Sequence, residues 1–153
     1  DEDPDYYQEC RQIASHMLLD NVIEFTGAVR IDDYLPIIDI VVFTSISEAQ
    51  PLVILEVGAA GIPIVSTDVG ACDEMINGTP EESPHLGSGG IIVELSNPSA
   101  IAAGVVKLLS DRSFYESCSS TIRQRVSKLY HKKSQHAAYD SLYKGLLRER
   151  DHS

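Results

Sequence analysis

The sequence predicts an α/β fold with a doubly wound parallel sheet, and three observations support this prediction. Short runs rich in β-branched residues alternate with segments of helical periodicity, which is the pattern of repeated βαβ units. One run, residues 40–43, is apolar on both faces, as is typical of a strand that helices cover from both sides. The chain has 153 residues and is 43% hydrophobic, which suits one globular domain and argues against intrinsic disorder.

Four segments are predicted to be strands, at residues 22–26, 38–44, 62–67 and 90–94. Seven are predicted to be helices, at residues 5–19, 31–37, 51–60, 70–77, 99–109, 114–130 and 132–148. The prolines and glycines between residues 78 and 90 predict one long loop. The last two helices carry apolar side chains at helical spacing with lysines and arginines among them, so we expect both to cover the sheet and to present a solvated basic face. Attraction of that face to a membrane surface is the alternative.

Composition excludes several classes of function. The net charge of −11 would repel phosphate backbones, which argues against nucleic-acid binding. The acids are concentrated in residues 1–120, with twenty acids and four bases, whereas residues 121–153 carry three acids and eight bases. The longest apolar stretch, residues 51–65, is too short and too interrupted to span a bilayer. Three widely spaced cysteines without a CxxC motif suit a reducing compartment, so we expect a cytoplasmic protein.

Ligands of open α/β sheets bind outside the carboxyl ends of the strands, so the loops after the four predicted strands are the candidate sites. The loop after Thr44 is the most informative, because it combines small polar residues with a helix whose first turn is set by Pro51. The free amides at the start of that helix attract phosphate through the helix dipole. These amides belong to Leu52, Val53 and Ile54.

Two carboxylates belong to this loop and helix. Glu56 is the only charged residue of the helix, and its burial would be costly unless it accepted hydrogen bonds, for example from a diol. Glu48 lies eight residues earlier, so the two carboxylates can flank a bound molecule. In the alternative interpretation Glu48 caps the helix and Glu56 reaches solvent, and the pair alone does not decide between the two.

The spacing Glu-x7-Glu in residues 47–56, followed by residues 59–70, resembles the donor-binding half of retaining family 4 glycosyltransferases with the GT-B fold. Residues 22–27 with Tyr34-Leu35 and Asp39 resemble the preceding strand and short helix of that family, and residues 89–93 with Asn97-Pro98 resemble its closing strand. The resemblance holds over about residues 4–110. The sequences of residues 47–56 and 67–72 are most similar to exopolysaccharide transferases of the Pel type.

The resemblance implies that residues 1–153 are a partial nucleotide-sugar-binding domain, the Rossmann-like C-terminal half of a GT-B fold truncated at its N-terminus. It implies a full-length enzyme that transfers a hexose from a UDP-sugar to a polysaccharide or other glycan acceptor, without a metal or other cofactor. A location in the cytoplasm, peripheral to the inner face of the membrane, would suit exopolysaccharide biosynthesis. The alternative is a non-catalytic sugar-nucleotide-binding or interaction module of the same fold.

The resemblance also implies roles for individual residues. Glu48 would contact hydroxyls of the transferred sugar as the candidate catalytic residue, and Glu56 would bind the ribose hydroxyls. The loop with Gly27 and Val29 would meet the base through its backbone, although Gly27 alone also suits an ordinary strand end. The diphosphate would be held by the backbone amides around Gln50, Pro51, Leu52 and Val53, where Pro51 itself has no N–H to donate.

Two departures from the family pattern carry expectations. The Arg and Lys that neutralise the phosphates in the family have no counterpart here, and the acceptor-binding domain is absent, so we expect the chain alone to bind donor weakly and to be inactive. The family's first two strands are also absent, so we expect exposed sheet edges that recruit a further strand, for example from a second copy in a homodimer. The chain resembles a piece of something longer, since it lacks an initiator Met and a signal peptide.

Other candidate residues have simpler interpretations. Asp68 ends a predicted strand, where the phosphoacceptor of a receiver domain would lie, but we expect it to cap the turn at Val69-Gly70. Cys72 is interpreted as a packed thiol rather than a reactive one. The five histidines show no metal-binding spacing, so no metal site is predicted.

Overall fold

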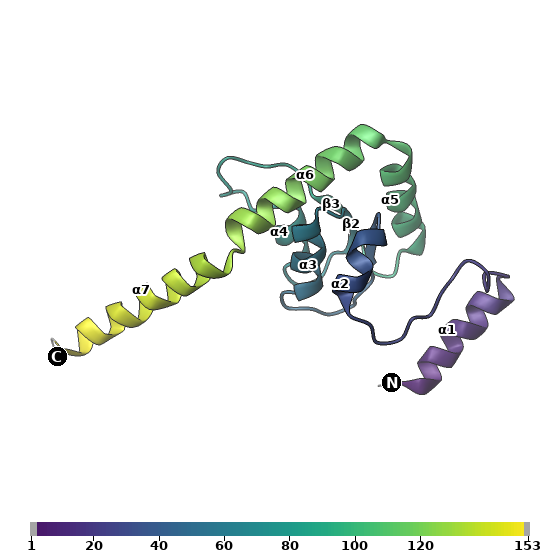
Figure 1. Ribbon diagram of the computed structural model, residues 1–153, viewed down its shortest axis with the longest axis horizontal. Coiled ribbons are helices and arrows are strands. Elements are labelled where there is room, and N and C mark those ends of the chain that lie inside the picture. The colour runs from purple at the N-terminus through teal and green to yellow at the C-terminus, as the bar shows by residue number, and fades with distance from the viewer. Residues whose placement is uncertain (1–2, 152–153) are drawn as a thin grey trace. The chain divides into compact units, whose positions relative to one another are not determined.

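The computed structural model describes residues 3–151, and the chain divides into two compact units between Tyr34 and Leu35. The first unit contains helices α1 (Pro4–His16) and α2 (Ile31–Tyr34) (Figure 1). The start of α1 is fixed by Asp3, whose carboxylate accepts a hydrogen bond from the amide of Tyr6 at 3.0 Å. Within this unit the rings of Tyr7 and Phe25 pack edge to face, 5.7 Å apart.

The prediction of a strand at residues 22–26 is wrong, because this segment is irregular and makes no ladder. Its apolar side chains are largely exposed, with Val22 at 77% and Ile23 at 41% of their full accessibility. A strand forms only where a neighbouring strand satisfies its backbone N–H and C=O groups. The described residues of the first unit include no second strand, so the β-branched composition alone cannot make one.

The second unit is built on a parallel sheet. Its strands are β1 (Val41–Phe43), β2 (Ile64–Thr67) and β3 (Gly90–Val93), in the order β1-β2-β3, with β2 buried throughout. The 3₁₀ turn η1 (Leu35–Ile37) precedes the sheet, and the helices are α3 (Leu52–Ala60), α4 (Cys72–Asn77), α5 (Pro98–Ser110), α6 (Arg112–Leu129) and α7 (Lys132–Asp151). The predicted α/β fold with a parallel sheet is confirmed, and the helix boundaries differ from the prediction by a few residues.

Helices cover both faces of this sheet, as Figure 1 shows for α3 and α4 on one side and α5 on the other. Successive residues of β2 define the two sides, since Ile64 packs with α3 and α4 while Val65 packs with α5. Helix α6 contributes to both clusters, with Cys118 in one and Ile122 in the other. This double cover explains why the strands read as continuous apolar runs.

A glycine permits the close contact of α3 with α6. A Cβ atom at Gly58 would lie 2.8 Å from Cγ2 of Val126 and 2.9 Å from Cγ1 of Ile122, closer than packed carbon atoms allow. Helix α3 therefore turns Gly58 toward α6, and this close packing fixes the position of α3 over the sheet. This placement matters because the candidate site lies at the start of α3.

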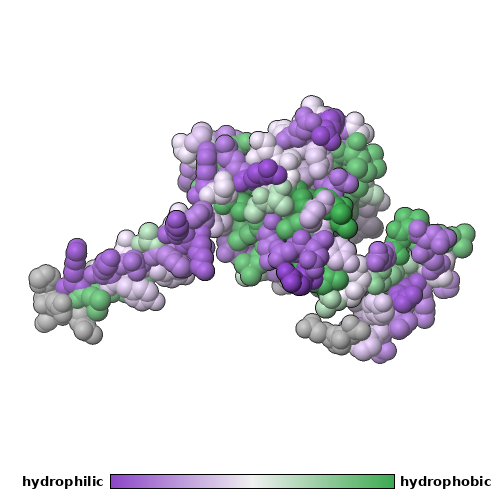
Figure 2. All heavy atoms as spheres, viewed as in Figure 1, coloured by the Kyte–Doolittle hydropathy of each residue, from purple (hydrophilic) through white to green (hydrophobic). Residues whose placement is uncertain are grey.

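The prediction that both terminal helices cover the sheet is correct for α6 and wrong for α7. Helix α6 buries Ile122 and Val126, whereas Leu142, Tyr143 and Leu146 of α7 are more than half exposed. Figure 2 shows a mainly hydrophilic surface on the visible side of α7, with few hydrophobic side chains. An apolar stripe is buried only where a facing surface exists, and none of the described residues supplies one. No helix in the described part of the chain is long and apolar enough to cross a bilayer.

Candidate functional site

Two loops meet at the carboxyl edge of the sheet. Because β1 and β2 are parallel, the loop that leads to α3 and the turn that leads to α4 leave the sheet at the same edge. Two hydrogen bonds join them: Oγ1 of Thr67 donates to the carbonyl of Ser45 at 2.5 Å, and the amide of Ala71 donates to the carbonyl of Ala49 at 2.9 Å. These two hydrogen bonds therefore hold the two loops together at the carboxyl edge of the sheet.

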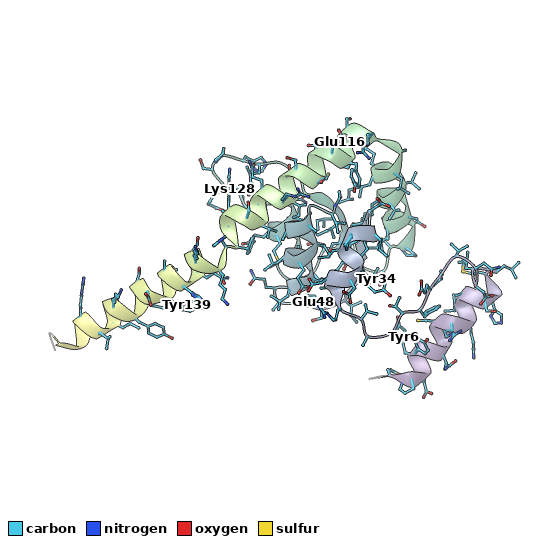
Figure 3. All side chains as sticks on the ribbon, in the orientation of Figure 1. Tyr6, Tyr34, Glu48, Glu116, Lys128 and Tyr139 are labelled. Atoms are coloured by element: carbon cyan, nitrogen blue, oxygen red, sulfur yellow. The ribbon has the colours of Figure 1, made fainter. Side chains whose placement is uncertain are left out.

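Glu48 lies in the first of these loops, ahead of α3 (Figure 3). Its side chain is half-buried, and Oε1 accepts a hydrogen bond from Oγ of Ser45 at 2.7 Å. Within residues 3–151 no donor contacts its second oxygen, Oε2. The interpretation of Glu48 as a helix cap is not supported, because the residue before α3 is Pro51 and no side chain caps this helix.

The start of α3 presents two of the three unpaired backbone donors that the sequence predicts, and the prediction is wrong for Ile54. Pro51 is buried with φ −71° and ψ 121°, which suits entry into a helix. No described acceptor pairs with the amides of Leu52 and Val53, whereas the amide of Ile54 donates to the carbonyl of Pro51 at 3.3 Å. Gln50 and Leu52 are exposed beside these donors. Such a helix start can hold an anion through two amides and the positive end of the helix dipole.

Glu56 lies one turn further along α3, on the same exposed face as Leu52. The argument that this carboxylate needs a ligand because it is buried is not supported, since Glu56 is exposed and can be hydrated. Glu56 nevertheless comes soon after the two free amides in the chain, and it lies on the same helix face as Leu52. The other face, with Ile54 and Val57, packs into the core.

The loop predicted to meet the base belongs to the other compact unit. Gly27 and Val29 belong to the first unit, which is described here by itself. Gly27 has φ +64°, a left-handed conformation that favours glycine, and Val29 is 47% exposed. The backbone of this loop is thus accessible, as its predicted role requires.

Gly70 is a site residue whose importance the sequence alone did not reveal. It has φ +53°, and a Cβ atom there would lie 2.2 Å from the carbonyl oxygen of Glu48 and 2.7 Å from that of Ala49. Only glycine permits this approach of the β2–α4 turn to the loop of Glu48. The signal in the sequence was the Val69-Gly70 turn, whose partner across the sheet edge could not be identified.

A second polar cluster, at the opposite edge, was also missed. Arg125 of α6 is fully buried and forms an ion pair with Glu82, with Nε donating to Oε1 at 2.7 Å and Nη2 to Oε2 at 2.9 Å. The guanidinium also donates to three carbonyls, those of Ile76, Asn77 and Gly87. This network ties the end of α4 and the long loop to α6, at the edge where β3 begins.

The prediction that the bases of this helix lie on a solvated face is therefore wrong for Arg125. Its place between the apolar positions Ile122 and Val126 was the available signal. The hydrogen bonds of Arg125 hold the pKa of Glu82 down at about 2, with smaller contributions from the amide of Leu86 and from His85, 3.7 Å away. Every group in this cluster has a partner inside the protein, which marks it as structural.

The remaining candidates have no evident chemistry. Cys10, Cys72 and Cys118 are free thiols; Cys72 is buried, as expected for a packed thiol, and burial raises the pKa of Cys118. Asp68 is exposed, and its amide donates to the carbonyl of Val93. No group of three or more His, Cys, Asp or Glu side chains that could hold a metal occurs among residues 3–151.

A groove of about 550 Å³ runs along α6, away from Glu48. Its charged groups are already engaged, because Arg112 pairs with Glu116 and Arg123 donates to the carbonyl of Ala60 at the end of α3. Arg123 thus caps the negative end of the α3 dipole. All of the residues that line the groove belong to α6, and none of the predicted site residues is among them, so the carboxyl edge remains the candidate site.

Comparison with known proteins identifies the family. The family described as "Glycosyl transferases group 1" matches residues 2–111. The chain belongs to this family. It is 27% identical over 137 residues to the lipopolysaccharide core biosynthesis mannosyltransferase LpsB of Rhizobium meliloti (strain 1021), a match that covers 90% of the chain and 37% of the relative. It is 24% identical over 139 residues to the N-acetyl-alpha-D-glucosaminyl L-malate synthase of Bacillus anthracis, with 90% and 34% covered.

Solved structures of glycosyltransferases share this fold. The structure of Anabaena Alr3699/HepE in complex with UDP superposes with a TM-score of 0.79 at 20% identity, over 92% of this chain and 37% of that one. The C-terminal domain of the group 1 glycosyl transferase LpcC from Francisella tularensis superposes with a TM-score of 0.68 at 24% identity, over 86% and 65%. The chain therefore shares the α/β fold of the C-terminal domains of GT-B glycosyltransferases, and it spans about a third of the length of the curated relatives.

Proposed function

We propose that this chain is the donor-binding part of a retaining glycosyltransferase that transfers a hexose from a UDP-sugar to a polysaccharide or other glycan acceptor. The observation that supports this most is the carboxyl edge of the sheet. There an oriented carboxylate, Glu48, with one free oxygen precedes the unpaired amides of Leu52 and Val53. Carboxylate oxygens accept from sugar hydroxyls, and backbone amides donate to phosphate oxygens.

Each residue has a role in this proposal. Glu48 contacts hydroxyls of the transferred sugar, and Glu56, on the same helix face as Leu52, accepts from the ribose diol. The diphosphate binds where α3 starts, at a backbone shaped by Gln50, Pro51, Leu52 and Val53. The structural neighbour HepE has been solved with UDP and with UDP-glucose, which supports a uridine nucleotide as the donor carrier. The backbone around Gly27 and Val29 would read the base.

Charge predicts that the chain by itself binds donor poorly. Residues 44–61 contain two acids and no base, and a diphosphate needs a cation or many donors to offset its charge. We therefore propose that the cationic groups and the acceptor site belong to other parts of a longer enzyme. Calorimetry of UDP with this chain should give a dissociation constant above about 1 mM, and transfer activity should be absent. Micromolar binding would mean that the phosphate partners lie within this chain.

The wider role is a proposal as well. The resemblance to Pel-type transferases points to exopolysaccharide synthesis in the cytoplasm, without a metal cofactor. The outer edges of β1 and β3 are unpaired within the described sheet, so a further strand, from the same enzyme or from a second copy, would complete it. Light scattering of the isolated chain should then show a dimer or larger, and a monomer over a wide concentration range would contradict this.

The alternative is a non-catalytic sugar-nucleotide-binding module of the same fold, which the absence of bases around Glu48 favours. The two are separated by assaying the full-length protein that carries this sequence with a panel of UDP-hexoses and glycan acceptors. The proposal predicts transfer with the anomeric configuration of the donor kept, as seen in the NMR spectrum of the product. An inverted product, or binding of UDP-sugars without transfer to any acceptor, would overturn it.

A further inference from the structure

The Glu48 side chain is held by one neutral donor. Oγ of Ser45 donates to Oε1 at 2.7 Å, three residues away in the same loop. A glutamate has three rotatable bonds, so an otherwise free carboxylate in this loop would sample many orientations. The hydrogen bond selects one of them and leaves Oε2 available for a ligand. Ser45 therefore controls how the carboxylate is presented.

Ser45 is itself held by the neighbouring strand. Oγ1 of Thr67, which is only 2% exposed, donates to the carbonyl of Ser45 at 2.5 Å and lies 3.5 Å from that of Phe43. The contact between Ser45 and Thr67 joins residues 22 positions apart in the sequence. Thr67, at the end of β2, therefore fixes the position of Ser45, and Ser45 in turn orients the Glu48 carboxylate.

The backbone of the loop has two further anchors. The amide of Ala71 donates to the carbonyl of Ala49 at 2.9 Å, and Gly70 lies so close to Glu48 that no side chain would fit between them. The loop backbone is therefore fixed at Ser45, Glu48 and Ala49 without any contribution from the Ser45 hydroxyl. Removal of that hydroxyl should leave the fold intact and free only the Glu48 carboxylate.

We infer that Ser45 is a positioning residue, which orients the Glu48 carboxylate toward the hydroxyls of the donor sugar, with Thr67 holding Ser45 in place. The inference rests on the proposed function and adds to it the residue through which Glu48 acts. Orientation of a group that contacts the reacting sugar affects the transition state more than it affects binding of the distant nucleotide. The effect of Ser45 is therefore on kcat.

The first test is the kinetics of Ser45→Ala in the full-length protein. We expect kcat to fall about tenfold while the donor KM stays within about twofold, and the midpoint of thermal unfolding to stay unchanged. Ser47→Ala is the matched control, because Ser47 is an exposed serine of the same loop with no described hydrogen bond from its hydroxyl, and it should keep wild-type kinetics. Wild-type kcat in Ser45→Ala, or a lowered unfolding midpoint with kcat and KM both changed, would overturn the inference.

The second test places Ser45→Ala in a Glu48→Ala background. If Ser45 acts through Glu48, the double variant should be no slower than Glu48→Ala alone, because the carboxylate that Ser45 orients is gone. If Ser45→Ala lowered kcat in the Glu48→Ala background by the same factor as in the wild type, Ser45 would act independently of Glu48. That result would overturn the inference. An inactive Glu48→Ala with an unaffected Ser45→Ala would overturn the inference and leave the proposed function standing. Wild-type activity in Glu48→Ala would overturn both.

Discussion

The two polar clusters at opposite edges of the sheet differ in what they leave unpaired. At the amino edge, the edge of the sheet where β3 begins, the buried guanidinium of Arg125 donates to Glu82 and to three main-chain carbonyls. At the carboxyl edge, Oε2 of Glu48 and the amides of Leu52 and Val53 have no partner among the described residues. A cluster that satisfies all its members internally stabilises the fold, whereas one that keeps oriented groups free is suited to a ligand.

The largest effect should come from the amino edge. Arg125→Met leaves Glu82 buried without its cation and three carbonyls without donors, so we expect a loss of about 3–5 kcal/mol in the free energy of unfolding. Urea unfolding of the chain measures this. Arg123→Met is the matched control on the same helix, where an exposed hydrogen bond to the carbonyl of Ala60 should be worth about 1 kcal/mol or less. Equal losses in the two variants would contradict the division between the edges.

The carboxyl edge should respond in activity rather than in stability. In the full-length protein, Glu56→Gln should raise the donor KM by removing a charged acceptor for the ribose diol, at a cost of about 1.5–3 kcal/mol. Glu48→Gln should lower kcat more than it raises KM, because it misorients the sugar while nucleotide contacts stay intact. Both variants should unfold at the wild-type urea concentration. Wild-type kinetics in both would make Glu48 and Glu56 ordinary loop and surface acids.

Acid should weaken the amino edge selectively. The folded-state pKa of Glu82, about 2, lies below its ordinary value of 4.5, mainly because Arg125 donates to the ionised carboxylate. The stabilisation is therefore complete above about pH 4.5 and is lost as the pH falls from there toward 2. Glu82→Gln should be less stable than wild type at pH 7, and the difference should shrink between pH 4.5 and 2, as urea unfolding across this range measures. A difference that is independent of pH would contradict this.

Features of the fold that depend on local pattern were predictable. The runs around Val41, Ile64 and Ile91 each became a parallel strand, although only β2 is buried throughout and Val42 of β1 is 43% exposed. The run at residues 22–26 is also rich in β-branched residues but is not a strand, because pairing depends on a neighbour that composition does not specify. For the same reason α7 follows the predicted periodicity and still leaves its apolar stripe uncovered.

The site was predictable to the same extent. The placement of Glu48, Pro51 and Glu56 follows from a strand, a loop and a helix that are consecutive in the sequence. The contacts that organise the site are not local: Thr67 reaches Ser45 across 22 positions, and Arg125 reaches Glu82 across 43. Such pairs are set by the order of strands and by the packing of α6, so no spacing rule along the chain reveals them.

The central claim is that the carboxyl edge binds a nucleotide, whereas the amino edge only stabilises the fold. NMR tests this claim most directly. A titration of the isotope-labelled chain with UDP to about 10 mM would detect binding of millimolar strength. We predict that the amide signals of Leu52 and Val53 shift in proportion to occupancy, while that of Gly87, beside Arg125, stays in place. Shifts confined to the surroundings of Gly87, or no shift at Leu52 and Val53 at about 10 mM UDP, would contradict the account.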